Sequence, residues 1–472
     1  MRVRNPRTGE YDYAIAPLTG PQVAAEAATL RARQPAWAAL PFADRAAVLE
    51  RFAAILEANA APIAAALTID TGRGAISHVE VSGTVAAIRR WAANAERIAT
   101  AAYPAPRQTS LPGVTATVHL RPYSLVGAIS PWNFPLTLAL IDAIPALAAG
   151  CAVIVKPSEV TPRFIPPLTE LLAQLPELPL RVIEGDGATG AALVDAVDYI
   201  AFTGSVATGR KVAEAAARAF IPASLELGGK DPMLVLASAD PHCAAQVALR
   251  ASVVNTGQAC QSIERIYVAR AIAEPFLAAL VAAAEQVRLS YPDPGSGELG
   301  PFIFARQAEI VRAQLDDAVT KGARILTGGR VEKLGGGLYL RPTVVTGVHD
   351  DMLLMQEETF GPVLPVTVFD TVDEAVALAN SGSFGLSAAV LAGTLAEAEA
   401  VALRLDAGGV SLNDGALTAF VSDAEKSSFG LSGLGPSRMG DSGLLRFFRR
   451  QALLRQSGQP MPLAMFAEDA RR

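Results

Sequence analysis

The sequence predicts an α/β protein built from a doubly wound parallel sheet, a second α/β domain and a small β unit. From Leu125 onward, short apolar segments alternate with helical stretches, at residues 126–130, 152–156, 181–184 and 199–202. Strands that alternate with helices are typical of βαβ units. The 472 residues are 51% apolar and 18% charged, so the chain is long and apolar enough to bury more than one core.

The N-terminal part predicts amphipathic helices that pack on something larger. Between residues 20 and 102, alanine-rich apolar positions alternate with Arg, Glu and Asp at a spacing of three to four. Residues 114–123 alternate β-branched with other residues and predict an exposed strand, which can pair with another subunit. The tail at 444–454 is apolar with interspersed arginines, and either an edge strand or a helix fits it.

A second unit is expected after Lys230. Its predicted elements are strand 232–236, a helix that carries Cys260, strand 266–269, long helices through Val319, a loop at 335–337, strand 339–345, a Gly-Pro turn at 361–362 and a last unit at 384–413.

Composition excludes several classes of function. The net charge of -6 and the lack of basic tracts longer than a pair give no reason to expect a nucleic-acid partner. The histidines and the three cysteines lack metal-ligand spacing, so neither a zinc site nor a disulfide scaffold is expected, and the chain suits a reducing, cytoplasmic compartment. The N-terminus lacks the apolar core of a signal peptide. The apolar region 136–155 contains Asp142 and Pro145, so a buried helix and strand are expected there rather than a membrane span.

Two glycine motifs compete as phosphate sites. Gly185-Asp-Gly187-Ala-Thr-Gly190 matches the dinucleotide fingerprint, but Ser205 stands about where the acidic residue is expected. The motif from Gly204 to Lys211 is close to a triphosphatase loop, but Arg-Lys stands where Lys and then Ser or Thr is required, which disfavours ATP hydrolysis. Gly204-Ser205 can still present helix N-terminal amides to a pyrophosphate, and an N-cap at Ser205 is compatible with this role.

The segment around Cys260 (Val-Asn-Thr-Gly-Gln-Ala-Cys-Gln-Ser) is the candidate reaction centre. A free cysteine alone is more often a small buried apolar residue than a nucleophile. Here a carboxylate, Glu226, precedes a Gly-Gly turn, and the Pro-Trp-Asn-Phe-Pro run at 131–135 supplies an amide donor. Together with the Phe-Thr-Gly-Ser turn at 202–205, these residues predict oxidation of a carbonyl group through a covalent intermediate.

These motifs jointly resemble those of the aldehyde dehydrogenase superfamily, over nearly the whole chain from about residue 4 to 454. The motifs that carry the resemblance are Pro131-Trp-Asn-Phe-Pro135, Lys156-Pro-Ser-Glu159, Phe202-Thr-Gly-Ser205, Glu226-Leu-Gly-Gly229, Gly257-Gln-Ala-Cys260, Glu358-Thr-Phe-Gly-Pro362 and Asn413. The resemblance implies a Rossmann-type cofactor domain at 1–106 and 123–229, a catalytic domain at 230–427, and an oligomerisation segment at 107–122 and 428–472. A homodimer or homotetramer is expected from it, and no metal.

The resemblance also implies the roles of the reactive residues. Cys260 is the expected nucleophile toward an aldehyde. The Asn133 side chain and the Cys260 N–H are the expected oxyanion hole. Glu226 is the expected general base for thioester hydrolysis, and a structural carboxylate that accepts bonds from the Gly-Gly turn is the alternative. The presence of this glutamate favours release of a free acid over transfer to coenzyme A.

For the cofactor, Lys156 and Glu159 resemble the pair that binds the adenosine ribose. A carboxylate there repels a 2′-phosphate, so NAD is expected and NADP is the alternative. Glu358 resembles the residue that holds the nicotinamide ribose, and Phe360 the residue that packs near the nicotinamide. The other expected cofactor residues are Ile129, Ser130, Trp132, Ser158, Gly187, Phe202, Gly204, Ser205, Gly209 and Leu227.

The substrate pocket is expected at Phe134, Leu138, Ile141, Gln261 and Leu417. Its apolar members favour an aliphatic or aromatic aldehyde, and a semialdehyde dehydrogenase, a coenzyme A-acylating relative and a non-catalytic descendant are the alternatives. The family often carries lysine where Asp142 stands, so the route of proton exit is open. The segment ending in Gly435-Pro-Ser-Arg-Met-Gly440 departs from the commoner Gly-Arg-Glu ending.

Overall fold

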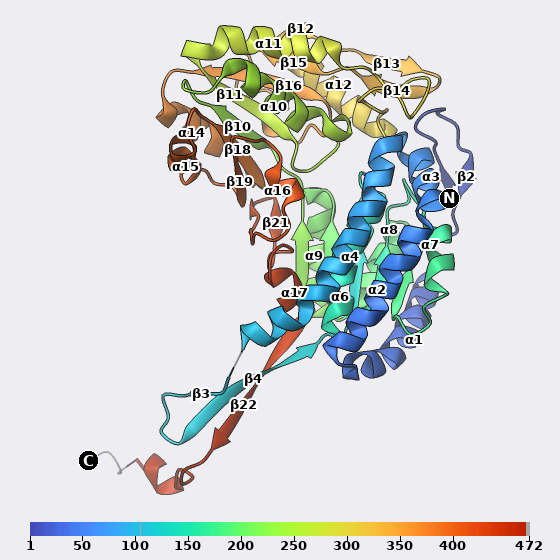
Figure 1. The fold of residues 1–472 in the computed structure, drawn as a ribbon, viewed down its shortest axis with the longest axis vertical. Coiled ribbons are helices and arrows are strands. Elements are labelled where there is room, and N and C mark those ends of the chain that lie inside the picture. Colours follow the sequence, from blue (N-terminus) through green and yellow to red (C-terminus); the bar gives the residue numbers. More distant parts are fainter. Residues whose placement is uncertain (104, 469–472) are drawn as a thin grey trace.

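The computed structural model describes residues 1–103 and 105–468, which form two sheet-centred lobes and a projecting β arm (Figure 1). One lobe contains a six-stranded sheet, the other a seven-stranded sheet, and the arm a three-stranded sheet. This arrangement confirms the predicted α/β class with a doubly wound parallel sheet. Residues 104 and 469–472, which belong to the predicted 1–106 and 428–472 segments, lie outside the described residues.

The six-stranded sheet reverses its strand order beside its central strand. Its order is β21 (Gly433–Leu434), β9 (Ala223–Glu226), β8 (Tyr199–Thr203), β5 (Leu125–Ile129), β6 (Ala152–Lys156) and β7 (Leu180–Val182). All neighbours pair in parallel except β21, which pairs antiparallel with β9. The chain runs from β5 outward to β7, and then returns to the other side of β5 as β8 and β9. Ligands bind at such a switch point, beyond the carboxyl ends of the strands.

Helices cover both faces of this sheet because its central strands carry apolar side chains on both faces. On β6, Val153 and Val155 belong to one core, and Ala152 and Ile154 to another. The first core contains residues of α2 (Phe42–Ala58), α3 (Ala60–Thr71), α4 (Gly74–Ala102), α5 (Pro135–Leu140), α6 (Ala143–Ala149) and α7 (Ile165–Leu172). The second contains residues of α1 (Gly20–Ala39), α8 (Gly187–Ala196) and α9 (Val206–Ala219). The expected buried helix and strand at 136–155 are thus α5, α6 and β6.

Among the described residues, no single helix is long and apolar enough to cross a membrane, and α2 with α3 meets that length and composition only as a pair bent by 68°.

The seven-stranded sheet forms the second lobe. Its order is β12 (Arg324–Thr327), β15 (Thr343–Thr346), β16 (Val363–Phe369), β11 (Ile263–Ala269), β10 (Asp231–Val235), β18 (Ser387–Leu391) and β19 (Gly409–Leu412). Helices α10 (Pro241–Val253) and α11 (Ala273–Gln286) share a core on one face, and α12 (Ala305–Thr320), α14 (Val372–Asn380) and α15 (Leu395–Ala402) on the other. The strand predicted at 339–345 is instead two, β14 (Gly337–Leu340) and β15, because Pro342 between them has no N–H to donate.

The prediction of a helix that carries Cys260 is wrong. Helix α10 ends at Val253, and a one-turn 3-10 helix, η1 (Val254–Gly257), precedes the cysteine. Asn255 and Thr256 have φ of 60° and 59°, and Gly257 has φ of 67°. A left-handed backbone ends an α-helix, and a Cβ on Gly257 would lie 2.3 Å from the Gly361 carbonyl oxygen. Cys260 therefore lies in a tight loop.

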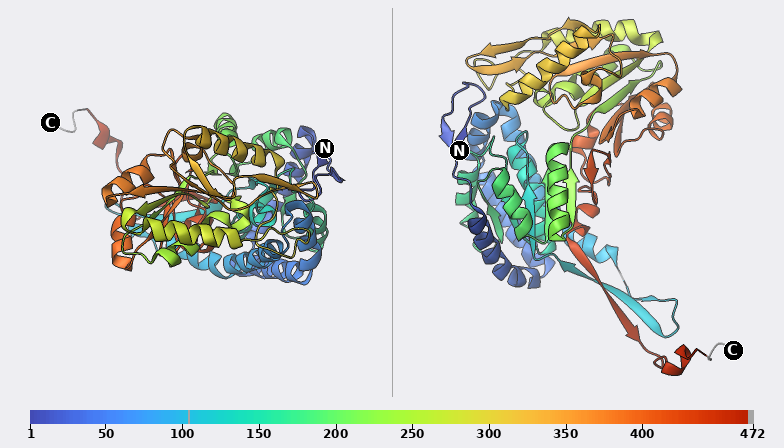
Figure 2. Two further views of the ribbon diagram at one scale, coloured as in Figure 1. Left: turned by 90° about the horizontal axis from the view of Figure 1, so that it is seen from above. Right: turned by 180° about the vertical axis from the view of Figure 1, so that it is seen from behind.

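The arm consists of β3 (Arg107–Gln108), β4 (Val114–Pro122) and β22 (Phe448–Gln456), which project from the lobes (Figure 2). Strands β4 and β22 pair antiparallel over their whole length. The exposed strand predicted at 114–123 is confirmed. For the tail at 444–454, the sequence left an edge strand and a helix open. The structure has a short helix, α17 (Ser442–Leu445), followed by the strand β22.

Candidate active site

A cleft of about 1160 Å³ lies at the switch point, beyond the carboxyl ends of β5 and β8. It continues to Cys260 and to residues of α12 in the second lobe. Sixteen of the predicted site residues line it: Ile129, Ser130, Trp132, Asn133, Leu138, Lys156, Ser158, Glu159, Gly187, Phe202, Gly204, Ser205, Leu227, Cys260, Glu358 and Phe360. The sequence-distant motifs therefore meet in one cavity.

The first turn of α9 is shaped to accept an anion. Ser205 caps this helix, with its hydroxyl accepting from the Thr208 N–H at 3.4 Å. The N–H groups at a helix start lack intrahelical partners and form the positive end of the helix dipole. Gly209 lies behind this turn rather than in the cleft, and a Cβ there would come within 2.6 Å of Leu227. Glycine thus lets α9 lie close to the sheet, with its N-terminus at the cavity.

Two carboxylates, those of Glu159 and Glu358, line the cleft. Glu159 lies 3.2 Å from the Lys156 ammonium, which also donates to the Gly185 carbonyl at 3.0 Å. Glu358 accepts from the Gly229 N–H at 3.3 Å. Burial, reinforced by the Glu264 carboxylate, raises the pKa of Glu358 to about 8.

Three aromatic rings form part of the cleft wall. The Trp132 ring lies 5.4 Å from Phe360, edge to face, and 6.0 Å from Phe304. All three residues line the cleft. A flat heteroaromatic ring suits such a wall, and with the α9 N-terminus and the two carboxylates the cavity fits a dinucleotide.

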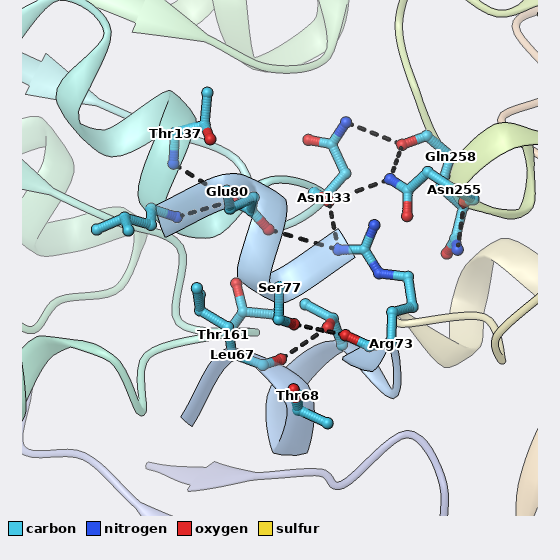
Figure 3. A network of polar contacts seen from close by, with 12 residues as sticks. Leu67, Thr68, Arg73, Ser77, Glu80, Asn133, Thr137, Thr161, Asn255 and Gln258 are labelled. Carbon is cyan, nitrogen blue, oxygen red and sulfur yellow. Dashed lines mark hydrogen bonds and ion pairs between the residues drawn. The ribbon is translucent and has the colours of Figure 1, made fainter. Parts of the chain in front are cut away.

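Asn133 is held by a buried polar network that joins the two lobes (Figure 3). Its side-chain Nδ2 donates to the Gln258 carbonyl at 2.9 Å. Its own carbonyl accepts from Arg73 at 3.0 Å and from Asn255 at 3.1 Å. One amide N–H of Asn133 is thereby used, which leaves the other for the cleft.

Glu80 on α4 contacts the same network through Arg73. Its carboxylate accepts from the N–H groups of Leu136 and Thr137, at 3.2 and 3.3 Å, and lies 3.7 Å from Arg73. Burial raises the pKa of Glu80 to about 7. The start of α5, and with it Asn133, is therefore anchored to α4.

Cys260 faces a mixed electrostatic environment. Burial, together with the Glu358 carboxylate, raises the pKa of its thiol to about 12, and Lys426 and Arg438 oppose this rise. The thiol is therefore protonated at neutral pH in this state, and a thiolate needs a base or further positive charge.

Glu226 ends β9 and does not line the large cleft. One of its carboxylate oxygens lies 3.7 Å from the Nε of Arg438, and 18% of its side chain is exposed. Arg438 in turn donates to Asp142 at 3.0 Å, and Arg446 also donates to Asp142. Burial opposes ionisation of Asp142, but the two arginines outweigh it and lower its pKa. Where the family often has lysine, this chain thus has Asp142 with two guanidinium groups.

The predicted substrate residues are dispersed. Leu138 lines the large cleft, and Ile141 lines a separate cavity of about 100 Å³ that also includes Arg438. Phe134 lies under the Arg73 guanidinium, 5.4 Å away. Gln261 accepts a hydrogen bond from Lys426, and Leu417 is 43% exposed. Lys426 and Arg438, which sequence reasoning missed, come from a C-terminal segment that matches no motif.

Comparison with known proteins decides the family. The model described as the aldehyde dehydrogenase family matches residues 1–453. This chain belongs to the aldehyde dehydrogenase family. It is therefore an oxidoreductase that acts on aldehydes with NAD or NADP.

Solved structures of other aldehyde dehydrogenases share the whole fold. An Anabaena variabilis protein named as the aldehyde dehydrogenase PutA has a TM-score of 0.95 and 49% identity, with 98% of each chain covered. Lactaldehyde dehydrogenase from Escherichia coli has a TM-score of 0.91 and 30% identity, with 97% of this chain and 96% of that chain covered. Betaine aldehyde dehydrogenase from Staphylococcus aureus, solved with NAD+, has a TM-score of 0.91 and 28% identity, with 98% and 92% covered.

Two curated relatives differ in the substrates that their names state. A Mycolicibacterium smegmatis protein named as an NADP-dependent succinate-semialdehyde dehydrogenase is 40% identical over 92% of this chain and 84% of its own length. A Methylomonas protein named 4,4'-diapolycopene aldehyde oxidase is 42% identical over 65% of this chain and 57% of its own length. Membership of the family thus leaves the aldehyde undetermined.

Proposed function

We propose that this aldehyde dehydrogenase oxidises its substrate hydrolytically, with Cys260 as the nucleophile: RCHO + NAD+ + H2O gives RCOO− + NADH + 2 H+. The observation that carries the proposal is the position of Cys260 and Asn133 on one cleft whose other end suits a dinucleotide. In this scheme the lobe of residues 1–106 and 123–229 binds the cofactor, and residues 230–427 supply the nucleophile. The bound nicotinamide supplies the acceptor for the hydride that the thiohemiacetal loses.

The free N–H of Asn133 and the backbone N–H of Cys260 act as the oxyanion hole in this proposal. Fixed donors stabilise the tetrahedral oxyanion because they need no reorganisation during the reaction. The Gln258 carbonyl and Arg73 hold Asn133 in place. Loss of one such donor typically raises the barrier by about 3–4 kcal/mol.

Glu226 acts as the general base. It takes the proton of the attacking water, which adds to the thioester carbon and expels the Cys260 thiolate with the carboxylic acid product. Arg438, whose Nε lies 3.7 Å from one Glu226 oxygen, orients the carboxylate beside the reaction centre. Glu226 does not line the large cleft, so we propose that its side chain turns toward Cys260 for the hydrolysis step.

For the cofactor, we propose a preference for NAD over NADP. Glu159 lines the cleft beside Lys156, where a carboxylate accepts bonds from ribose hydroxyls and repels a 2′-phosphate. The α9 N-terminus at Ser205 would hold the pyrophosphate, and Glu358 the nicotinamide ribose.

We also propose that the β arm pairs subunits into a homodimer or homotetramer. Strand β22 carries the exposed apolar residues Leu453 and Leu454, at 41% and 68%, on an arm that projects from the lobes. Exposed apolar strands of this kind are suited to pairing between subunits.

The experiment is an assay of NADH or NADPH formation over short aliphatic, long aliphatic, aromatic and semialdehyde substrates. Turnover that prefers NAD and is lost in Cys260→Ala supports the proposal. Turnover that survives in Cys260→Ala would remove Cys260 as the nucleophile. A product that forms only when coenzyme A is added would replace hydrolysis by acyl transfer.

A further inference from the structure

Lys426 places an ammonium group beside the residue that follows the reactive cysteine. It lies in the segment between α16 (Leu417–Phe420) and β20 (Phe429–Gly430). Its Nζ donates to the Gln261 side-chain carbonyl at 3.0 Å and to the Thr418 backbone carbonyl at 3.4 Å. The bond to Gln261 places the ammonium group beside the loop that contains Cys260.

The environment of Lys426 is largely buried and does not provide a direct counterion. Burial lowers the pKa of Lys426, and the charges of Cys260, Glu226 and Asp231 act in the opposite direction. Within residues 1–103 and 105–468, none of the ion pairs within 4 Å involves Lys426. Lys230, by contrast, is fully buried and lies 2.8 Å from Glu264. Lys426 has three N–H donors and uses two on neutral oxygens, so one remains for an anion.

The second cation near Cys260, Arg438, already pairs with carboxylates of the protein. Arg438 donates to Asp142 and Thr203, and its Nε lies 3.7 Å from Glu226. Its charge is therefore balanced by two carboxylates of the protein. Arg438 therefore has carboxylate partners within the protein, whereas Lys426 has none within 4 Å in the part of the chain that the structure describes. The charge of Lys426 can be balanced by an anionic group of an incoming molecule.

We propose that Lys426 is a specificity-determining residue that binds a carboxylate at the far end of a short aldehyde, so that the substrate class is a semialdehyde acid. This inference rests on the proposed oxidation at Cys260 and replaces the apolar aldehyde expected from the sequence. The balanced reaction is −OOC-R-CHO + NAD+ + H2O to −OOC-R-COO− + NADH + 2 H+. The aldehyde carbon bonds to Cys260 Sγ while the carboxylate lies against the ammonium group.

The anion site can be tested without turnover by alkylation with two reagents that differ in charge. Iodoacetate and iodoacetamide both transfer a two-carbon group to a thiolate and release iodide, but only iodoacetate carries a carboxylate. Mass spectrometry of digested protein gives both rates at Cys260, and the exposed Cys243 is an internal control. In Lys426→Met, the iodoacetate to iodoacetamide rate ratio at Cys260 should fall by about tenfold or more, the effect of losing one charged hydrogen bond.

Lys426→Arg should keep that ratio within about twofold because it keeps the positive charge. Lys333→Met, on the exposed face of β13 (Val331–Leu334), should leave it unchanged. An unchanged ratio in Lys426→Met would overturn the proposal. An equal slowing of both reagents at Cys260 would also overturn it, because Lys426 would then act by stabilising the thiolate.

Steady-state kinetics supply the second arm, with 4-oxobutanoate and pentanal as substrates of similar length. Lys426→Met should raise KM for 4-oxobutanoate by roughly 10- to 100-fold and change KM for pentanal by less than about twofold. Equal loss on both substrates would contradict the proposal. If the wild-type enzyme oxidised neither aldehyde while the alkylation ratio still depended on Lys426, the proposed reaction would fail and the anion site would stand.

Discussion

Replacement of Asp142 by asparagine should destabilise the protein strongly. Asp142 is 2% exposed, and its two oxygens accept from Arg438 and Arg446, whose side chains are 7% and 0% exposed. The Asp142→Asn substitution keeps the shape but removes the carboxylate that pairs with Arg446, and leaves Arg438 with Glu226, 3.7 Å away. Removing one partner of a buried ion pair typically costs about 3–5 kcal/mol.

The assay is urea unfolding followed by tryptophan fluorescence, with Asp373→Asn as the matched control. Asp373 pairs with Arg404 at 2.6 Å, but its side chain is 86% exposed. A solvated pair of this kind contributes at most about 1 kcal/mol, so the control should retain nearly the wild-type midpoint. If Asp142→Asn unfolded at the same urea concentration as Asp373→Asn, the charge balance argued for Asp142 would be wrong.

Three further results are expected. Because the pKa of Glu358 is raised to about 8 and its ionised form is the better acceptor for ribose hydroxyls, NAD affinity measured by calorimetry should rise from pH 7 to 9, and Glu358→Gln should remove that rise. Because the pKa of Cys260 is raised to about 12, alkylation by iodoacetamide without cofactor should accelerate about tenfold per pH unit between pH 7 and 10, and a plateau below pH 9 would contradict this environment. Gly257→Ala should lower the melting temperature and turnover, since φ is 67° and the new Cβ would meet the Gly361 oxygen, whereas Gly83→Ala, on a helix with open space, should not.

The parallel sheet could be predicted from sequence because its strands are short apolar runs between helices. Residues 152–156 form β6 with the predicted bounds, and 199–202 lie within β8. Motifs that follow such strands meet at the carboxyl edge, so most of the expected cofactor residues line one cleft. The local apolar pattern and the sheet topology were therefore sufficient to predict the position of the cofactor cleft.

Other features depend on contacts that no local pattern encodes. The end of α10 at Val253 has no glycine or proline signal, and the left-handed backbone of Asn255 and Thr256 beyond it is set by tertiary contacts. The polar contacts of Lys426 come from a segment distant in sequence from Cys260 and without a motif. The contact between the Phe134 ring and the Arg73 guanidinium likewise joins two elements that no local pattern brings together.

Hydrolytic oxidation at Cys260 requires a covalent acyl intermediate that Glu226 helps to hydrolyse. Glu226→Gln should be mixed with an aldehyde that the wild type oxidises and with NAD, quenched in acid, digested and analysed by mass spectrometry. We expect a burst of NADH near one equivalent per active site and an acyl adduct on the Cys260 peptide, with Cys151 and Cys243 unmodified. Steady turnover in this variant with an unmodified Cys260 peptide would rule out the acyl intermediate on Cys260.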